Sequence, residues 1–246
     1  LSSDLILQDD LAKLEQWEQL WDMEFHPSKC EHIVFSTKRQ PAAESLYLHD
    51  TEISKADHIR YLGVTLDPKL NWNKHIDNVA AKGNSTLGFI RRNVLTNSET
   101  VKATAYKQLV RPVLEYASSS WDSASDTAVS RLEAVQRRAA RLICGIRRTD
   151  RKTSTTSLLQ KLDLKPLSER RSDRRLKVFS QYHHSSKAVI SNYIQPTSFS
   201  SARKHTLQYF IPHTNTLHYQ RSFFLRTAKE WNALPADSQH LLPPRV

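Results

Sequence analysis

The scarcity of glycine limits the folds open to this chain more than any other feature, because only four glycines occur among 246 residues. Sheets with many tight turns and Gly-rich phosphate loops depend on glycine, which adopts backbone angles that other residues avoid. Hydrophobic residues make up 39% of the chain, enough for a core. We therefore expect a mainly α-helical α+β fold, with a small antiparallel sheet, a helical bundle and a small C-terminal α/β segment.

Apolar residues recur at helical spacing over most of the chain after Asn73. The expected helices cover 73–92, 98–117, 126–145, 153–161, 167–184 and 221–232. The fourth of these is the weakest, because residues 153–157 are Thr and Ser, which are poor helix formers.

The first 66 residues predict one helix followed by short strands. A single apolar stripe marks the helix: Leu7, Leu11, Leu14, Trp17 and Trp21. Pro27 bars continuation, so the helix should end near Phe25. Strand-like runs cover 31–36, 46–48 and 58–66, and a further strand pair is expected at 207–211 and 217–219.

These patterns divide the chain into four parts. We expect a helix-and-strand module at 1–72, a helical region at 73–184, a polar linker at 185–204 and a C-terminal extension at 205–246.

The net charge of +11 is unevenly distributed. Residues 1–30 carry seven acids against two lysines, whereas residues 131–180 carry fifteen Lys and Arg against five acids. A basic block of this density indicates a polyanionic partner, most simply nucleic acid. The alternative is a set of solvated helix faces in a basic but inert protein.

Arginines concentrate in two of the expected helices, opposite their apolar stripes, as a surface that follows a phosphate backbone requires. The candidate nucleic-acid-binding residues there are Arg137, Arg138, Arg141, Arg170, Arg171, Arg174 and Arg175, together with Arg148 just beyond the end of the helix 126–145. Glu133, Glu169 and Asp173 are close enough in sequence to form salt bridges that would neutralise part of this charge.

No residue set predicts a self-sufficient catalytic or metal site. Asp9 and Asp10 are adjacent, but neighbouring helical side chains point about 100° apart, so we interpret them as a solvated face. His26, Cys30 and His32 match no structural zinc spacing, and Cys30 is expected to pack as a small hydrophobe. Both cysteines are expected to be free thiols.

We also expect no targeting signal. The sequence has no run of 18 apolar residues, and its first residues do not have the pattern of a signal peptide, so we expect no membrane partner and a place inside the cell, in nucleus or cytoplasm.

Several strings together resemble one family, the reverse transcriptases of LINE-type non-LTR retrotransposons. They are LQDDLAKLEQWEQLWDMEFHPSKC, YLGVTLDPKLNWNKHI, AYKQLVRPVLEYASSSWD, LEAVQRRAARLICG and RSFFLRTAKEWNALP. Each is a moderate match alone, but their order and spacing across residues 5–235 make the resemblance specific. The chain resembles the family's C-terminal part: the end of the palm, the thumb and the post-thumb region.

The resemblance implies a role in RNA-directed DNA synthesis, with an RNA template, a DNA primer and their hybrid duplex as partners. It also implies that Lys29 matches a palm lysine suspected of protonating the departing pyrophosphate. Tyr61, Leu62 and Gly63 match a tight turn near the primer end. His26 stands where the family usually has Asn.

The family's fingers and aspartate-bearing hairpin have no counterpart in this sequence, so Mg²⁺ is expected for the complete polymerase but no cofactor for this chain. We expect a polymerase fragment that binds template and primer without catalysis. A repurposed free-standing interaction module and a functionless pseudogene product remain alternatives, and sequence upstream of Leu1 would distinguish them. The oligomeric state is left open.

Overall fold

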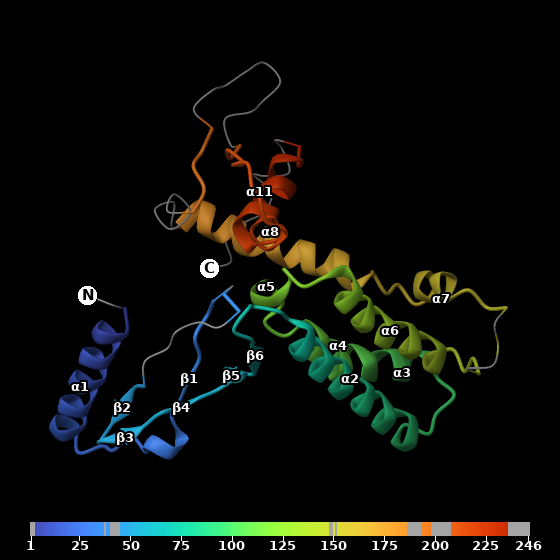
Figure 1. The fold of residues 1–246 in the computed structure, drawn as a ribbon. Helices are drawn as coiled ribbons and strands as arrows, with labels where there is room; N and C mark the ends of the chain where they lie inside the picture. The colour runs from blue at the N-terminus through green and yellow to red at the C-terminus, as the bar shows by residue number, and fades with distance from the viewer. Residues whose placement is uncertain are drawn as a thin grey trace. The chain divides into compact units, whose positions relative to one another are not determined.

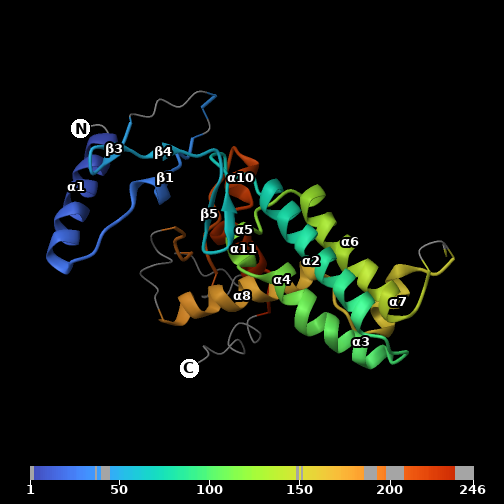
Figure 2. The ribbon, with the colours of Figure 1, turned by 90° about the horizontal axis from the view of Figure 1, so that it is seen from below.

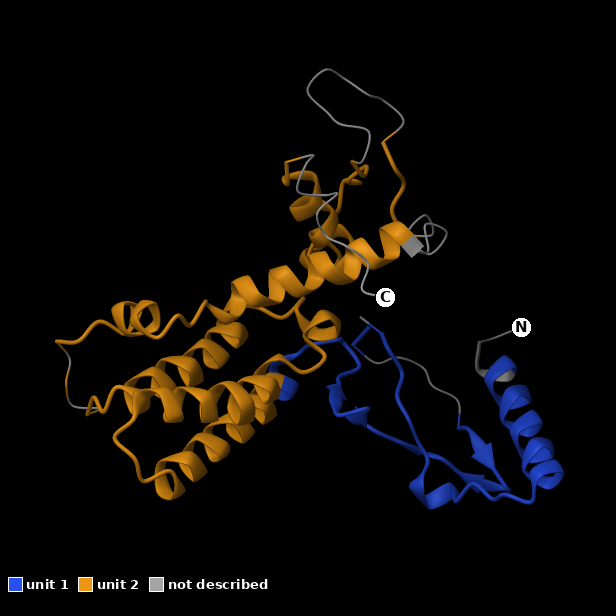
Figure 3. Ribbon diagram, turned by 180° about the vertical axis from the view of Figure 1, so that it is seen from behind, with its two compact units in different colours: residues 1–75 blue, residues 76–246 orange. Residues whose placement is uncertain are grey.

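The computed structural model describes residues 3–36, 38–39, 45–147, 150, 152–185, 193–197 and 208–235. The chain forms two compact units, Leu1–His75 and Ile76–Val246, coloured separately in Figure 3. Each is considered by itself below. Arg148 and most of the expected linker lie outside the described residues.

The first unit opens with helix α1, Ser3–Trp21, which ends four residues earlier than expected. Asp22 has a φ of +52°, and the N–H of Met23 donates to the carbonyl of Glu18 over 3.1 Å. This left-handed C-terminal turn, rather than Pro27, stops the helix. Pro27 instead begins a short 3-10 turn, Pro27–Lys29.

The strands of the first unit are shorter than expected and form three separate two-stranded sheets. Their bounds are β1 Glu31–His32, β2 Tyr47–Leu48, β3 Thr51–Glu52, β4 Ser54–Lys55, β5 Ile59–Tyr61 and β6 Val64–Leu66. β2–β3 and β5–β6 are antiparallel, but β1 pairs with β4 in parallel. The expectation of one antiparallel sheet is therefore wrong in this detail, because non-local pairing is not visible in local alternation.

The core of the first unit is small. Leu46, Leu48 and Ile53 are buried, with Leu11 of α1 and Cys30 packed against them. This confirms that Cys30 packs as a hydrophobe. Of the expected α1 stripe only Leu11 reaches this core, whereas Trp21 is 62% exposed.

The second unit is helical, and Figures 1 and 2 show α2, α4 and α6 side by side in both views. Its first elements are α2 Asn73–Asn93, which starts at the end of the first unit, α3 Glu99–Ala105, the π-helical turn η2 Tyr106–Val110, α4 Arg111–Glu115, α5 Ser118–Trp121 and α6 Asp126–Ile143. The later ones are α7 Thr155–Lys161, α8 Leu167–Ser185, α10 Leu217–Gln220 and α11 Phe223–Asn232. The expected helices in 73–184 are thus present.

Helix α6 carries much of the buried surface. Leu132, Val135, Ala139 and Ile143 are at most 2% exposed, as the apolar stripe predicts. Ser125 caps its N-terminus by accepting a hydrogen bond from the N–H of Ala128.

The C-terminal segment joins α8 through a second core. Phe179 of α8 packs with Ala228 and Trp231 of α11, and with Ile194 and Tyr209. The expected strand at 217–219 is wrong, since this stretch is α10, begun by Thr216, whose hydroxyl accepts from the N–H of Tyr219. The expected partner strand at 207–211 is described from residue 208 onward, and there an isolated antiparallel β-bridge joins Tyr209 to Pro196.

Mainly helical α+β architecture is therefore confirmed. Within the described ranges, no helix is long and apolar enough to cross a membrane.

The two units should differ in local stability. Two-stranded sheets of two or three residues hold few cooperative contacts, whereas α6 is anchored by fully buried side chains. Amide hydrogen exchange should show β1–β6 exchanging faster than α6, and limited proteolysis should cut within 1–70 first. Equal protection of the strands and α6 would contradict this ranking.

Candidate nucleic-acid interface

The C-terminal end of α6 lies at the edge of the candidate interface. Gly145 follows the helix with a φ of +67°, a conformation that favours glycine. The N–H of Ile146 donates to the carbonyl of Arg141 over 2.9 Å, and that of Gly145 to Leu142 over 3.3 Å. This paired closure folds Ile146 back beside the last turn.

A groove of about 510 Å³ runs between α2 and α6. Leu87, Leu142 and Ile146 form its apolar part. Three arginines surround it: Arg91 from α2, and Arg138 and Arg141 from α6. Arg138 and Arg141 are among the arginines expected from the sequence, whereas Arg91 is not, because its partner helix lies some 50 residues away in sequence.

Neutral groups hold the two α6 arginines in place. Arg138 donates to the side-chain oxygen of Asn84 over 2.9 Å, and Arg141 donates to the carbonyl of Asp150 over 2.8 Å. Neither acceptor atom carries a charge, so neither arginine is held by an ion pair within the described chain. Arg137 is exposed on the same helix and, like Arg91, forms no ion pair within the described chain.

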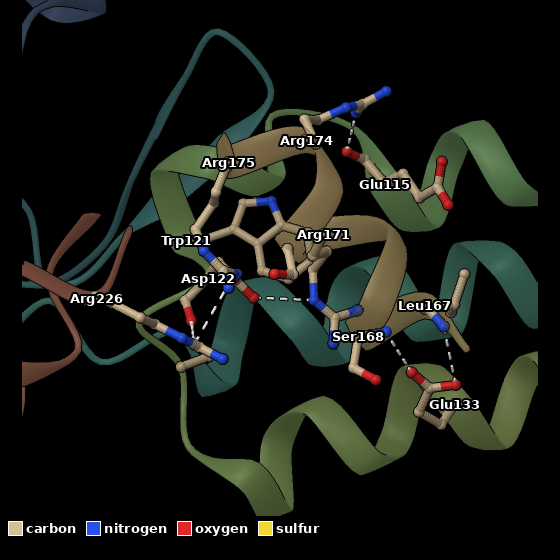
Figure 4. A network of polar contacts seen from close by, with 12 residues as sticks. Glu115, Trp121, Asp122, Glu133, Leu167, Ser168, Arg171, Arg174, Arg175 and Arg226 are labelled. Carbon is tan, nitrogen blue, oxygen red and sulfur yellow. Dashed lines mark hydrogen bonds and ion pairs between the residues drawn. The ribbon is translucent and has the colours of Figure 1, made fainter. Parts of the chain in front are cut away.

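Two of the α8 arginines lie in the core. Arg171 and Arg175 are each 2% exposed, and both contact the carboxylate of Asp122, which follows α5 (Figure 4). The Arg171 Nε–Asp122 Oδ1 distance is 2.9 Å, and Arg175 also pairs with Glu230 of α11. The expectation that these two project from a surface is wrong, because their charged partners come from distant parts of the chain.

The other two α8 arginines are also held by Glu115, at the end of α4. Arg170 forms two hydrogen bonds with its carboxylate, which raise the pKa of Arg170. Arg174, although exposed, donates to the Glu115 carbonyl over 2.8 Å (Figure 4). The charge of Arg170 is thus compensated by a carboxylate, whereas Arg174 is held by a neutral carbonyl and forms no ion pair with any described residue.

Glu133 illustrates the same non-local pairing. Rather than bridging to an arginine of its own helix, it accepts hydrogen bonds from the N–H groups of Leu167 and Ser168, over 3.3 and 2.9 Å (Figure 4). A carboxylate at this position satisfies the free N–H groups of α8 and interacts favourably with the helix dipole.

Burial lowers the pKa of Arg171 and of Arg175, although a guanidinium still stays charged at neutral pH. Arg171 also lies over the Trp121 ring, with its guanidinium carbon 5.9 Å from the centroid. Arg226 of α11 donates to the Asp122 carbonyl over 2.9 Å. This buried cluster therefore connects α5, α8 and α11.

The residues that the resemblance singled out in the first unit are all exposed. Lys29 ends the 3-10 turn. Tyr61, Leu62 and Gly63 form the tip of the β5–β6 hairpin, with φ of +47° at Leu62 and +84° at Gly63. Positive φ at both central residues is the geometry of a tight two-residue hairpin turn. A tight turn is present here, whereas its contact with a primer stays a prediction.

The acidic pair on α1 shares one lysine, which compensates one of its two charges. Asp9 and Asp10 both pair with Lys13, over 2.6 and 3.0 Å, and these bonds raise the pKa of Lys13. This agrees with a solvated helix face. Both cysteines are free thiols, as expected. Among described residues, no three His, Cys, Asp or Glu side chains gather in a way that could hold a metal ion.

Comparison with curated proteins establishes the relationship. Over 144 residues, 56% of this chain, it is 28% identical to the probable RNA-directed DNA polymerase from transposon X-element of Drosophila melanogaster. Over the same length it is 26% identical to the RNA-directed DNA polymerase from mobile element jockey of that species. The chain is a relative of non-LTR retrotransposon reverse transcriptases. The resemblance drawn from its residue strings is confirmed.

The match spans only a small part of these reverse transcriptases: 16% of the X-element polymerase and 15% of the jockey polymerase. A third relative, the probable RNA-directed DNA polymerase from transposon BS of D. melanogaster, is 25% identical over 141 residues and is matched over 16% of its length. No protein-family model and no solved structure matches the chain.

Replacing a buried arginine should lower the free energy of unfolding more than replacing an exposed one. Arg171→Ala should lower the free energy of unfolding by about 3 kcal/mol, because it removes one partner of a buried ion pair while Arg175 still contacts Asp122. Arg137→Ala, at an exposed position, should change it by less than about 0.5 kcal/mol. Urea unfolding followed by circular dichroism measures both, and similar losses for the two variants would contradict the assignment.

Proposed function

We propose that this chain binds the phosphate backbone of nucleic acid along the groove between α2 and α6. The observation that supports it is the convergence of Arg91, Arg138 and Arg141, with no carboxylate paired to any of them in the described chain. Arginine presents a planar fork of donors that matches phosphate oxygens. The exposed Arg137 extends the positive surface along α6.

The proposed partner is a duplex of RNA template and DNA primer, by analogy with the relatives named as RNA-directed DNA polymerases. Contacts from arginine to phosphate position a duplex without reading its bases, so binding should tolerate any sequence. Arg148, Arg170 and Arg174, the hairpin tip at 61–63 and Lys29 remain further predicted contacts. Arg171 and Arg175 are not part of this surface, because they are buried.

The proposed role is to hold template and primer rather than to form bonds. Two-metal polymerisation requires carboxylates that converge on the ions. The described part of the chain offers no such group, so its residues do not fit the Mg²⁺ centre that a complete polymerase needs.

Affinity for a hybrid duplex should fall steeply with salt, because each phosphate contact releases counterions. The double variant Arg137→Gln/Arg138→Gln should flatten the slope of log K against log salt by about 1 to 2 units. Fluorescence anisotropy over a salt series measures the slope.

The matched control is Lys82→Gln/Lys177→Gln, which removes the same charge from exposed positions that do not line the groove. If both double variants changed the slope equally, the effect would come from net charge alone. If the wild-type chain failed to bind even at low salt, the proposal would be rejected.

Primer extension tests whether this chain binds template and primer without itself catalysing DNA synthesis. With a poly-A template, a DNA primer and Mg²⁺ or Mn²⁺, this chain alone should give no extension above a no-protein control. Extension that persists through stringent purification would contradict the role as a binding part.

A further inference from the structure

A second cavity, of about 240 Å³, lies in the second unit apart from the α2–α6 groove. Four cationic side chains line it together with one amide and one acid: Lys107, Arg111, Lys165, Arg170, Gln136 and Asp163. It shares no lining residue with the groove. None of these six residues except Arg170 was singled out by the sequence analysis.

A local distortion of the helix directs two of these cations into the cavity. Pro112 has no N–H and its ring would clash with the carbonyl four residues earlier in a regular α-helix. The chain widens instead into the π-helical turn η2, in which the N–H of Arg111 donates to the carbonyl of Tyr106, five residues back. Lys107 and Arg111 then both line the cavity. Single π-turns within helices occur frequently at functional sites.

A buried amide lies against the wall of the cavity. Gln136 of α6 is 1% exposed, and its side-chain oxygen accepts from the hydroxyl of Tyr106 over 2.8 Å. Its nitrogen donates to the carbonyl of Lys165 over 3.0 Å. Because the amide carries two N–H groups, one donor remains on a side chain whose position is set on both sides.

The charge of the cavity lining is not balanced. Arg170 is neutralised by Glu115. Lys107, Arg111 and Lys165 form no ion pair with any described residue, and Asp163 is the one acid in the lining. Three uncompensated cations against one carboxylate leave an excess of two positive charges. A phosphate monoester, at about −1.5 to −2 near neutral pH, matches this excess.

We infer that this cavity is a binding site for a phosphate group or a pyrophosphate, separate from the groove proposed to follow the nucleic-acid backbone. Its volume is below the range of about 300–1,000 Å³ typical of sites for whole small molecules, so it admits one or two phosphates but not a base and sugar as well. Two sources share this chemistry: free phosphate or pyrophosphate, and the terminal phosphate of a nucleic-acid strand.

Thermal unfolding in the presence of inorganic phosphate and pyrophosphate, at constant ionic strength set with NaCl, tests the site. A ligand that binds only the folded state raises Tm with the logarithm of its concentration. The wild-type chain should show this rise with pyrophosphate, and Lys107→Gln/Arg111→Gln should lose most of it. Lys82→Gln/Lys177→Gln, with the same loss of charge elsewhere, should respond as wild type does.

Phosphate also stabilises proteins by exclusion from their surfaces, which affects all variants alike. The test therefore compares the rise of Tm with pyrophosphate between Lys107→Gln/Arg111→Gln and its control Lys82→Gln/Lys177→Gln. Equal rises in these two variants would overturn the inference. If Lys107→Gln/Arg111→Gln did not fold, Lys165→Gln, at an exposed position on the rim, should show a reduced response instead, and a full response would again overturn it.

A binding comparison distinguishes free phosphate or pyrophosphate from the terminal phosphate of a strand. It uses two oligonucleotides of the same sequence, one with a 5′-phosphate and one with a 5′-hydroxyl. Binding at least fivefold tighter to the phosphorylated strand, lost in Lys107→Gln/Arg111→Gln, would assign the terminal phosphate. Equal binding together with a pyrophosphate-dependent Tm would assign the free ion. Arg137→Gln/Arg138→Gln should keep the pyrophosphate response, so failure of the groove proposal and failure of this one are distinguishable.

Discussion

The carboxylate of Asp122 is 4% exposed and faces the guanidinium groups of Arg171 and Arg175, with Arg226 bound to its backbone carbonyl. Removing charges from water costs several kcal/mol each, and only close pairing recovers that cost. The cluster can therefore form only when α5, α8 and α11 are all in place. That requirement makes α8 the helix on which the C-terminal half of the second unit depends.

This constraint separates arginines that look equivalent in sequence. On α8, three arginines pair with the carboxylates of Glu115, Asp122 and Glu230 and serve mainly as structure, whereas the exposed Arg174 donates only to a backbone carbonyl. On α6, Arg131 pairs with Asp77, but Arg138 is held by an amide and Arg141 by a backbone carbonyl, which position these two side chains without an ion pair in the described chain. The surface that we propose for phosphate therefore lies on α2 and α6, and on the lining of the smaller cavity beside η2.

Much of the fold was predictable because it follows from local rules. Helices α2, α6 and α8 agree with their apolar periodicity to within a few residues. The departures have local causes that compete with periodicity: a left-handed turn at Asp22, a threonine cap at Thr216 and a proline-induced π-turn before Pro112. The parallel pairing of β1 with β4 has no such local signal, since it joins segments some 20 residues apart.

The sequence by itself determined the helical class, the concentration of basic residues in 131–180 and the kinship with non-LTR retrotransposon reverse transcriptases, because composition, periodicity and residue strings are properties of the chain alone. Only the tertiary structure decided which arginines are free to bind an anion. That depends on acids and carbonyls brought from 49 to 55 residues away, such as Asp122 to Arg171, Glu115 to Arg170 and Asn84 to Arg138. Whether a charge is compensated is a property of its neighbours in space, and distance along the chain does not report it.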